Sequence, residues 1–214
     1  MSEKFVTQIK AGGDRNFSYL FGDGKFCALV DPAYEEKKII KVLKDSACKL
    51  QWILLTHSHA DHTASAESIA KQFSTRIAAY RTSITFFDKP LQDKDTLQVG
   101  SLKVRVLHTP GHADDSVCYH CEEWLFTGDT LYVGKVGGTD YGKGALDEYN
   151  SIHRVILSLP DETKIFPGHD YGIRPTSTVG EENKENPFIL RPDFESFLEL
   201  KKHWLEYKRE HGIK

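Results

Sequence analysis

A short histidine-rich segment follows the apolar stretch 52–55 and limits the folds open to this chain. Residues 56–62 read Thr-His-Ser-His-Ala-Asp-His, so four potential metal ligands stand within six positions. Alternate residues of an extended chain point the same way, so His57 and His59 can converge on one ion. Asp61 and His62 come where the chain turns into the next predicted helix. Burying these polar groups is costly unless an ion holds them, so the segment predicts a metal site at a strand end.

Three more candidate ligands, His112, Asp129 and His169, each follow another apolar stretch. Strand ends that meet at one edge of a sheet can bring such side chains together. Imidazole and carboxylate groups are ligands of Zn²⁺, Fe²⁺ and Mn²⁺, and no thiolate is needed. The sequence therefore predicts a centre for divalent metal ions built from distant segments.

Seven donors are more than one catalytic ion uses, but they suit two ions that share a carboxylate. The expected ligands divide into His57, His59 and His112 for the first ion, Asp61, His62 and His169 for the second, and Asp129 as the bridge. The other histidines lack such neighbours. We expect an indirect role at most for His108 and ordinary structural roles for the rest, which are His120, His153, His203 and His211.

Apolar runs bounded by turn residues alternate with amphipathic stretches along the chain. Strands are predicted at 5–9, 18–21, 26–31, 50–56, 76–80, 102–109, 116–120, 123–127 and 164–166. Helices are predicted at 35–44, 64–73, 146–159 and 193–210. This order indicates an α/β protein, an αββα sandwich of two mixed sheets packed face to face with helices outside. No linker divides the chain, so we expect one domain over residues 1–214, with 171–192 as a solvated loop.

Composition narrows the partners and the compartment. A formal charge of -3 and a pI near 6.4 argue against nucleic acid as a partner. No stretch approaches a membrane span, and the first residues do not resemble a secretory signal, so we expect a cytoplasmic protein. Its four cysteines are then expected as reduced thiols. The pair Cys118 and Cys121 falls in a predicted hairpin and is read as structural.

Taken together, these segments resemble the metallo-β-lactamase-fold superfamily from about residue 16 to residue 187. The resemblance implies the same αββα sandwich that the element order indicates. Within the superfamily, the chain is similar to the hydroxyacylglutathione hydrolases (glyoxalase II) and to the persulfide dioxygenases. Asp129 stands where a class B β-lactamase would carry a cysteine ligand, which argues against β-lactam hydrolysis.

The resemblance implies two alternative reactions. In the first, two ions, Zn²⁺ or else Fe²⁺ or Mn²⁺, hold a hydroxide that cleaves a thioester such as a hydroxyacylglutathione, and Asp61 and Asp129 orient this nucleophile. In the second, one Fe(II) on His57, His112 and Asp129 supports dioxygenation of glutathione persulfide. Segment 134–141 looks more like the dioxygenases, but these enzymes carry an arginine where Gly138 stands. A binding module without catalysis is a third alternative, although no ligand position is lost.

Loops near the ligand segments are expected to contact the substrate, a small thioester or thiol-derived molecule. The candidates are Tyr141, Lys143, Tyr171 and Arg174. Only 45 residues follow His169, so we expect no counterpart of the larger C-terminal helical region with which full-length glyoxalase II binds glutathione. Neither nucleic acid nor membrane is expected as a partner. The oligomeric state stays open, with a homodimer among the alternatives.

Overall fold

Two sheets of six strands each form the framework of the computed structural model, which describes residues 3–213. The first sheet has the order β1 (Phe5–Lys10), β2 (Phe17–Gly22), β3 (Phe26–Val30), β4 (Lys49–Leu54), β5 (Arg76–Tyr80) and β6 (Lys89–Leu91). The second has the order β14 (Ser177–Thr178), β13 (Lys164–Pro167), β10 (Trp124–Gly128), β9 (Val117–Cys121), β8 (Leu102–His108) and β7 (Thr96–Val99). A small ribbon pairs β11 (Leu131–Tyr132) with β12 (Lys135–Val136).

Both sheets are mixed, as expected. In the first sheet β3, β4, β5 and β6 run parallel, whereas β1 and β2 are antiparallel to their neighbours. In the second sheet only β10 and β13 pair in parallel. The carboxyl ends of these parallel strands are where the chain leaves the two sheets toward the predicted ligands.

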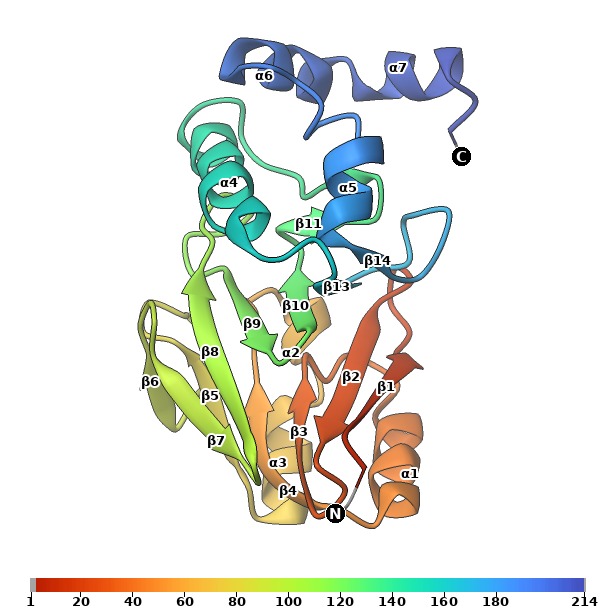
Figure 1. Cartoon of the computed structure of the whole chain (residues 1–214). Helices are drawn as coiled ribbons and strands as arrows, with labels where there is room; N and C mark the ends of the chain where they lie inside the picture. The colour runs from red at the N-terminus through yellow and green to blue at the C-terminus, as the bar shows by residue number, and fades with distance from the viewer. Residues whose placement is uncertain (1–2, 214) are drawn as a thin grey trace.

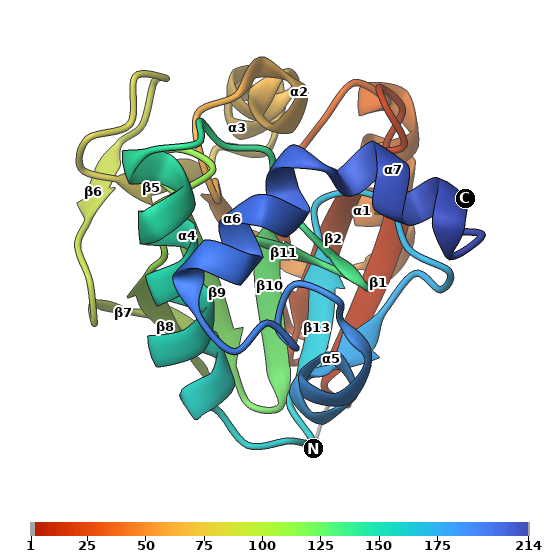
Figure 2. The ribbon, with the colours of Figure 1, turned by 90° about the horizontal axis from the view of Figure 1, so that it is seen from above.

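Side chains alternate between the two faces of each strand, which builds a layered core. Phe17, Tyr19 and Phe21 of β2 pack between the sheets, whereas Leu20 packs against the outer helices. The outer layer on the first sheet is α1 (Glu36–Ser46) and α3 (Ala66–Phe73). On the second it is α4 (Lys143–Arg154), α5 (Val179–Glu185) and α6 (Phe194–Lys202). Figures 1 and 2 show these two helical layers on opposite sides of the molecule, which confirms the αββα sandwich.

Two predictions for the C-terminal part of the chain, the loop at 171–192 and the single helix at 193–210, need correction. The stretch 171–192 is not a loop throughout, because α5 begins inside it. Its start is a capping box: Glu181 donates its backbone N–H to Thr178 Oγ1 at 3.1 Å, and the Glu181 carboxylate accepts from the Thr178 N–H at 2.9 Å. The C-terminal helix also breaks at His203, whose ψ of 20° leaves the helical region, so α6 is followed by a separate α7 (Trp204–Glu210).

The remaining helical segments are short. α2 (Ala60–Thr63) carries the histidine-rich segment into α3, and a 3₁₀ turn (Ile156–Ser158) follows α4. No helix within residues 3–213 combines the length and apolar character needed to cross a bilayer.

The expectation of four reduced cysteines is wrong for two of them. Cys27 in β3 and Cys48 just before the parallel neighbour β4 form a disulfide, with Cα atoms 5.9 Å apart. Sequence spacing alone did not reveal that these two positions are neighbours across a strand pair. Cys118 and Cys121 are free, buried and part of the β9–β10 hairpin, as predicted.

Loss of this disulfide should lower stability measurably. The bond closes a loop over a sequence separation of 21, so Cys48→Ser is expected to lower the free energy of unfolding by about 3 kcal/mol. Chemical denaturation with and without a reductant measures the effect. Thiol titration of the unfolded wild-type protein without reductant should find two thiols; four would contradict the pairing.

Candidate metal centre

The predicted ligands meet at the carboxyl ends of the central strands. His57 and His59 follow β4, whereas His62 lies in α2. Asp129 directly follows β10, and His169 follows its parallel neighbour β13. His112 comes after β8. All seven side chains are thus delivered to one place by strands from both sheets.

One group of three imidazoles faces a common point. His59 Nδ1 lies 3.0 Å from His57 Nε2 and 3.0 Å from His112 Nε2. His57 is buried, His112 is partly exposed and His59 is open to solvent on one side. This group can therefore hold an ion that a substrate can approach.

A second group consists of Asp61, His62 and His169. The Nε2 atoms of the two imidazoles are 3.2 Å apart, and Asp61 Oδ2 lies 3.5 Å from His62 and 3.4 Å from His169. Asp129 stands between the two groups, with Oδ2 at 3.5 Å from His112 Nε2 and 3.3 Å from His169 Nε2. One carboxylate is therefore within reach of both groups.

The imidazoles are fixed by contacts at their other nitrogen atoms. His62 Nδ1 lies 3.0 Å from Asp31 Oδ2, and His112 Nδ1 lies 2.8 Å from Gly138 O. His169 Nδ1 lies 2.8 Å from the backbone oxygen of Asp14. When an ion is bound, donation from Nδ1 to these acceptors would leave Nε2 free to bind it, the arrangement that metal-binding histidines use.

Asp31 and Asn16 support the ligands and were not predicted. Besides contacting His62, the Asp31 carboxylate accepts from the Thr56 N–H at 2.8 Å and from its hydroxyl at 2.6 Å. Asn16 Nδ2 donates to Asp61 Oδ2 at 2.9 Å. Asp31 did carry a signal, because it ends an apolar strand as Asp129 does. Asn16 carried none.

Asp31→Asn is expected to weaken metal binding about 10- to 100-fold, because an amide cannot accept the His62 proton as strongly as a carboxylate does. Titration of the metal-free protein with Zn²⁺ checks this. The exposed carboxylate of Asp161 offers a matched control, and Asp161→Asn should bind Zn²⁺ as the wild type does. Equal Zn²⁺ affinities of the two variants would show that Asp31 does not support the metal site.

Two glycines let the backbone come close to the ligands. A Cβ on Gly168 would lie 2.3 Å from Asp129 Oδ1 and 2.8 Å from His62 Cε1, so no side chain fits there. Gly128 has a φ of +50°, and a Cβ on it would lie 2.4 Å from Thr56 Oγ1. These positions allow Asp129 to sit directly beneath the imidazoles.

The charges of the cluster are strongly coupled. Burial alone would raise the pKa of Asp129, but His62 and the hydrogen bond from His169 hold it well below its usual range. Burial lowers the pKa of His169, but hydrogen bonds to Asp129 and Asp61 outweigh it and raise this pKa to about 9. Burial and the neighbouring His62 lower the pKa of His57. Asp129 is thus a buried carboxylate held in its ionised form by the neighbouring imidazoles.

The fit of the residues to metal ions rests on one orphaned atom. Asp129 Oδ1 is buried and accepts no hydrogen bond within residues 3–213; His62 Nε2 lies 3.3 Å away without suitable geometry. Such an anionic oxygen is costly to bury without a counter-charge. A divalent cation between the two groups would satisfy it, and the donor set suits Zn²⁺ or Fe²⁺.

The predicted substrate contacts fall in different places. Tyr171 stacks on His169, with ring centroids 4.6 Å apart, and its hydroxyl donates to Asp14 Oδ2 at 2.6 Å. Tyr141 is exposed, and Lys143 pairs with Asp147 in the first turn of α4. Arg174 contacts Glu185 at 3.0 Å, so its guanidinium is already engaged.

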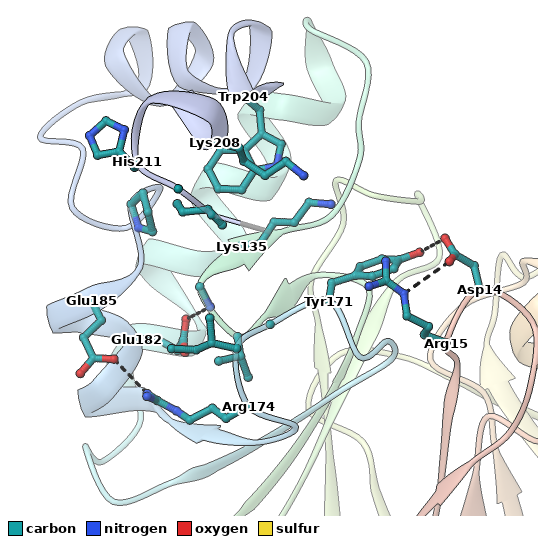
Figure 3. A pocket seen from close by; sticks show the side chains of 17 residues that line it. Asp14, Arg15, Lys135, Tyr171, Arg174, Glu182, Glu185, Trp204, Lys208 and His211 are labelled. Atoms are coloured by element: carbon teal, nitrogen blue, oxygen red, sulfur yellow. Dashed lines mark hydrogen bonds and ion pairs between the residues drawn. The ribbon is translucent and has the colours of Figure 1, made fainter. Parts of the chain in front are cut away.

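A cavity of about 880 Å³ is lined in part by Tyr171, the residue that stacks on His169 (Figure 3). Tyr171 and Arg174 line it, together with Lys135 of β12 and Trp204 and Lys208 of α7. Tyr141 and Lys143 do not. Lys135 and Lys208 were not predicted, because their proximity depends on where α7 packs.

The chain also matches a known family. The model of the metallo-β-lactamase superfamily matches residues 11–169, which include every predicted ligand. The chain belongs to this superfamily. The resemblance read from the His-x-His-x-Asp-His segment is thereby confirmed.

Two curated relatives show which members of the superfamily this chain is similar to. A probable polyketide biosynthesis zinc-dependent hydrolase, BaeB, of Bacillus velezensis is 31% identical over 90% of this chain and 87% of its own length. A probable hydroxyacylglutathione hydrolase of Schizosaccharomyces pombe is 36% identical over 75% of this chain, a match that spans 66% of the yeast protein.

Solved structures agree with this placement. ETHE1 from Myxococcus xanthus has a TM-score of 0.85 and 30% identity, covering 94% of this chain and 91% of its own. The B3 metallo-β-lactamase BLEG-1 has a TM-score of 0.79 and 30% identity, covering 87% and 100%. TTHA1623, solved in a di-iron-bound form, has a TM-score of 0.74 and 27% identity, covering 85% and 99%. The site of this superfamily member is that of a metal-dependent hydrolase, with two His/Asp groups for metal ions.

Proposed function

We propose that this protein hydrolyses thioesters at a centre of two divalent metal ions. The observation that carries the proposal is the pair of three-ligand groups with the Asp129 carboxylate between them. His57, His59 and His112 would hold one ion, and Asp61, His62 and His169 the other. The di-iron-bound form of TTHA1623 supports two ions, the probable zinc-dependent hydrolase BaeB supports metal-dependent hydrolysis, and the probable yeast hydroxyacylglutathione hydrolase supports a thioester.

Two bound divalent ions supply a water with a pKa near 7 and polarise the carbonyl of the substrate. The residues of this chain supply position and proton control. Asn16 holds Asp61 Oδ2, so the other carboxylate oxygen of Asp61 is free to orient a water and accept its proton. Asp61 is partly exposed whereas Asp129 is buried, so Asp61 is the carboxylate that faces the incoming substrate.

The second candidate is the non-haem iron persulfide dioxygenase implied by the resemblance. It needs one ion and leaves Asp61, His62 and His169 without a metal. The orphaned Asp129 Oδ1 faces His62 of this second group, which favours an ion there and therefore the hydrolase.

Metal analysis and a substrate panel test the proposal together. Native protein should carry two ions per chain and cleave S-lactoylglutathione or another acyl thioester, and chelation should remove both the ions and the activity. Glutathione persulfide with an oxygen electrode tests dioxygenation, and a chromogenic cephalosporin tests β-lactam cleavage. A single iron with oxygen uptake on the persulfide would overturn the proposal, as would cleavage of the cephalosporin alone.

A further inference from the structure

The cavity beside the cluster reaches the metal centre through one residue. Tyr171 stacks nearly parallel on His169, with 7° between the ring planes, and the same tyrosine lines the cavity. An acyl thioester with its carbonyl at the cluster can therefore extend its thiol carrier over Tyr171 into the cavity.

One part of the cavity gathers cationic groups around Tyr171 (Figure 3). Lys135 Nζ lies 4.7 Å and Arg15 Cζ 4.6 Å from the centroid of the Tyr171 ring. Burial, together with the neighbouring Lys208, lowers the pKa of Lys135. Within residues 3–213 neither lysine forms an ion pair, and Arg15 has only Asp14 at 3.6 Å. Clustered cations without counter-charges favour a bound anion.

The acidic residues of the cavity are already engaged. Asp14 accepts from the Tyr171 hydroxyl, and Glu185 pairs with Arg174. Glu182 accepts from the Gly134 N–H at 2.9 Å and from Asn186 at 2.8 Å. The cavity is therefore lined by three acidic side chains that already have partners and by four cationic ones, Arg15, Lys135, Arg174 and Lys208.

This imbalance discriminates between thiol carriers. Glutathione carries an ammonium group besides its carboxylates, and that ammonium would have to compete with the partners that Asp14, Glu182 and Glu185 already have. A phosphopantetheine arm carries a phosphate, amide carbonyls and two methyl groups, and no cation. Trp204, Pro187 and Ile213 line the cavity and offer apolar contacts for the methyl groups.

We propose that the cavity between β12, α5 and α7 binds a phosphopantetheine thiol carrier, with its phosphate at Lys135, Lys208 and Arg15. The proposal rests on the thioesterase activity proposed above and names its substrate class: acyl thioesters of coenzyme A or of a carrier protein. Lysine and arginine both bind phosphate through charge-assisted hydrogen bonds.

The test compares two substrates that differ only in the phosphate. Wild type should cleave S-acetyl-4′-phosphopantetheine with a kcat/KM about tenfold or more above that for S-acetylpantetheine, the effect of hydrogen bonds to a charged group. The double variant Lys135→Met/Lys208→Met should lose this preference. Lys135→Arg/Lys208→Arg should retain the preference, and Lys103→Met, at an exposed position of β8, should behave as wild type.

The outcomes are distinct. Equal kcat/KM for the two pantetheine esters would overturn the proposal, and so would a preference for S-lactoylglutathione that the double variant abolishes. Faster cleavage of acetyl-CoA or of an acetylated carrier protein than of S-acetylpantetheine supports the proposal. The faster of the two identifies whether the phosphopantetheine arm belongs to coenzyme A or to a carrier protein. If no thioester is cleaved, the proposed function fails, and calorimetric titration of 4′-phosphopantetheine against pantetheine still tests the cavity: equal affinities would refute it.

Discussion

Replacing Asp129 with alanine is expected to lower kcat/KM for the thioester by about 10³-fold or more. The substitution removes the one carboxylate that contacts both ligand groups, and ion-assisted chemistry supplies several kcal/mol of transition-state stabilisation. Metal content should fall as well, because His62 and His112 lose their shared anionic neighbour. Steady-state kinetics and elemental analysis of the same preparation measure both effects.

The control for this variant is Asp161→Ala, which removes an exposed carboxylate that follows the 3₁₀ turn. It changes the net charge by the same amount and should leave both activity and metal content at wild-type levels. An Asp129→Ala protein that kept two ions and the wild-type rate would mean that the ions, or the reaction, lie elsewhere. Thermal unfolding of the metal-free proteins separates a damaged fold from a damaged site.

The ligands could be predicted from the sequence because each of them follows an apolar stretch that predicts a strand. The segment 56–62 and the residues Asp129 and His169 follow predicted strands. The carboxyl ends of such strands can meet at one edge of a sheet, which brings the ligands together. Their supports are not local: Asp31 lies 31 positions from His62, and Asn16 lies 45 positions from Asp61. Only the pairing of distant strands brings such residues together.

The residues that line the cavity were harder still to predict from the sequence. Tyr171 was predicted from its position beside His169, whereas Lys135 and Lys208 stand far apart in the sequence and carry no motif. Their proximity follows from the break at His203, which the helical periodicity of 193–210 did not predict. The lining of this cavity therefore depends on the packing of α7, which the sequence pattern alone does not describe.

A buried ion pair ties those last helices to the metal centre. Lys201 of α6 pairs with Glu148 of α4, and Lys201 Nζ donates to Gly137 O at 2.7 Å. The next carbonyl, that of Gly138, holds His112 Nδ1. Both charged side chains are almost fully buried. The pair therefore fixes the loop that orients a predicted ligand.

Above pH 8, where Glu148 of the wild type is ionised, Lys201→Met is expected to lower the free energy of unfolding by up to about 3–5 kcal/mol, because Glu148 stays buried without its cation. The double variant Glu148→Leu/Lys201→Met removes both charges and should recover most of this loss. Urea denaturation of the metal-free proteins measures both values. A double variant no more stable than the single one would mean that the lysine acts through packing or through Gly137 rather than through charge.

The pH dependence of the Lys201→Met effect identifies its cause. Burial raises the pKa of Glu148 from 4.5 to about 8, although Lys201 opposes the shift. Without Lys201 the folded-state pKa rises further, so the folded chain holds a proton that the unfolded chain releases above pH 4.5. Stability then falls as pH rises, by up to about 1.4 kcal/mol per pH unit. The deficit relative to wild type should thus be largest above pH 8, where only the variant still loses stability through Glu148, and a deficit independent of pH would exclude the charge of Glu148 as its source.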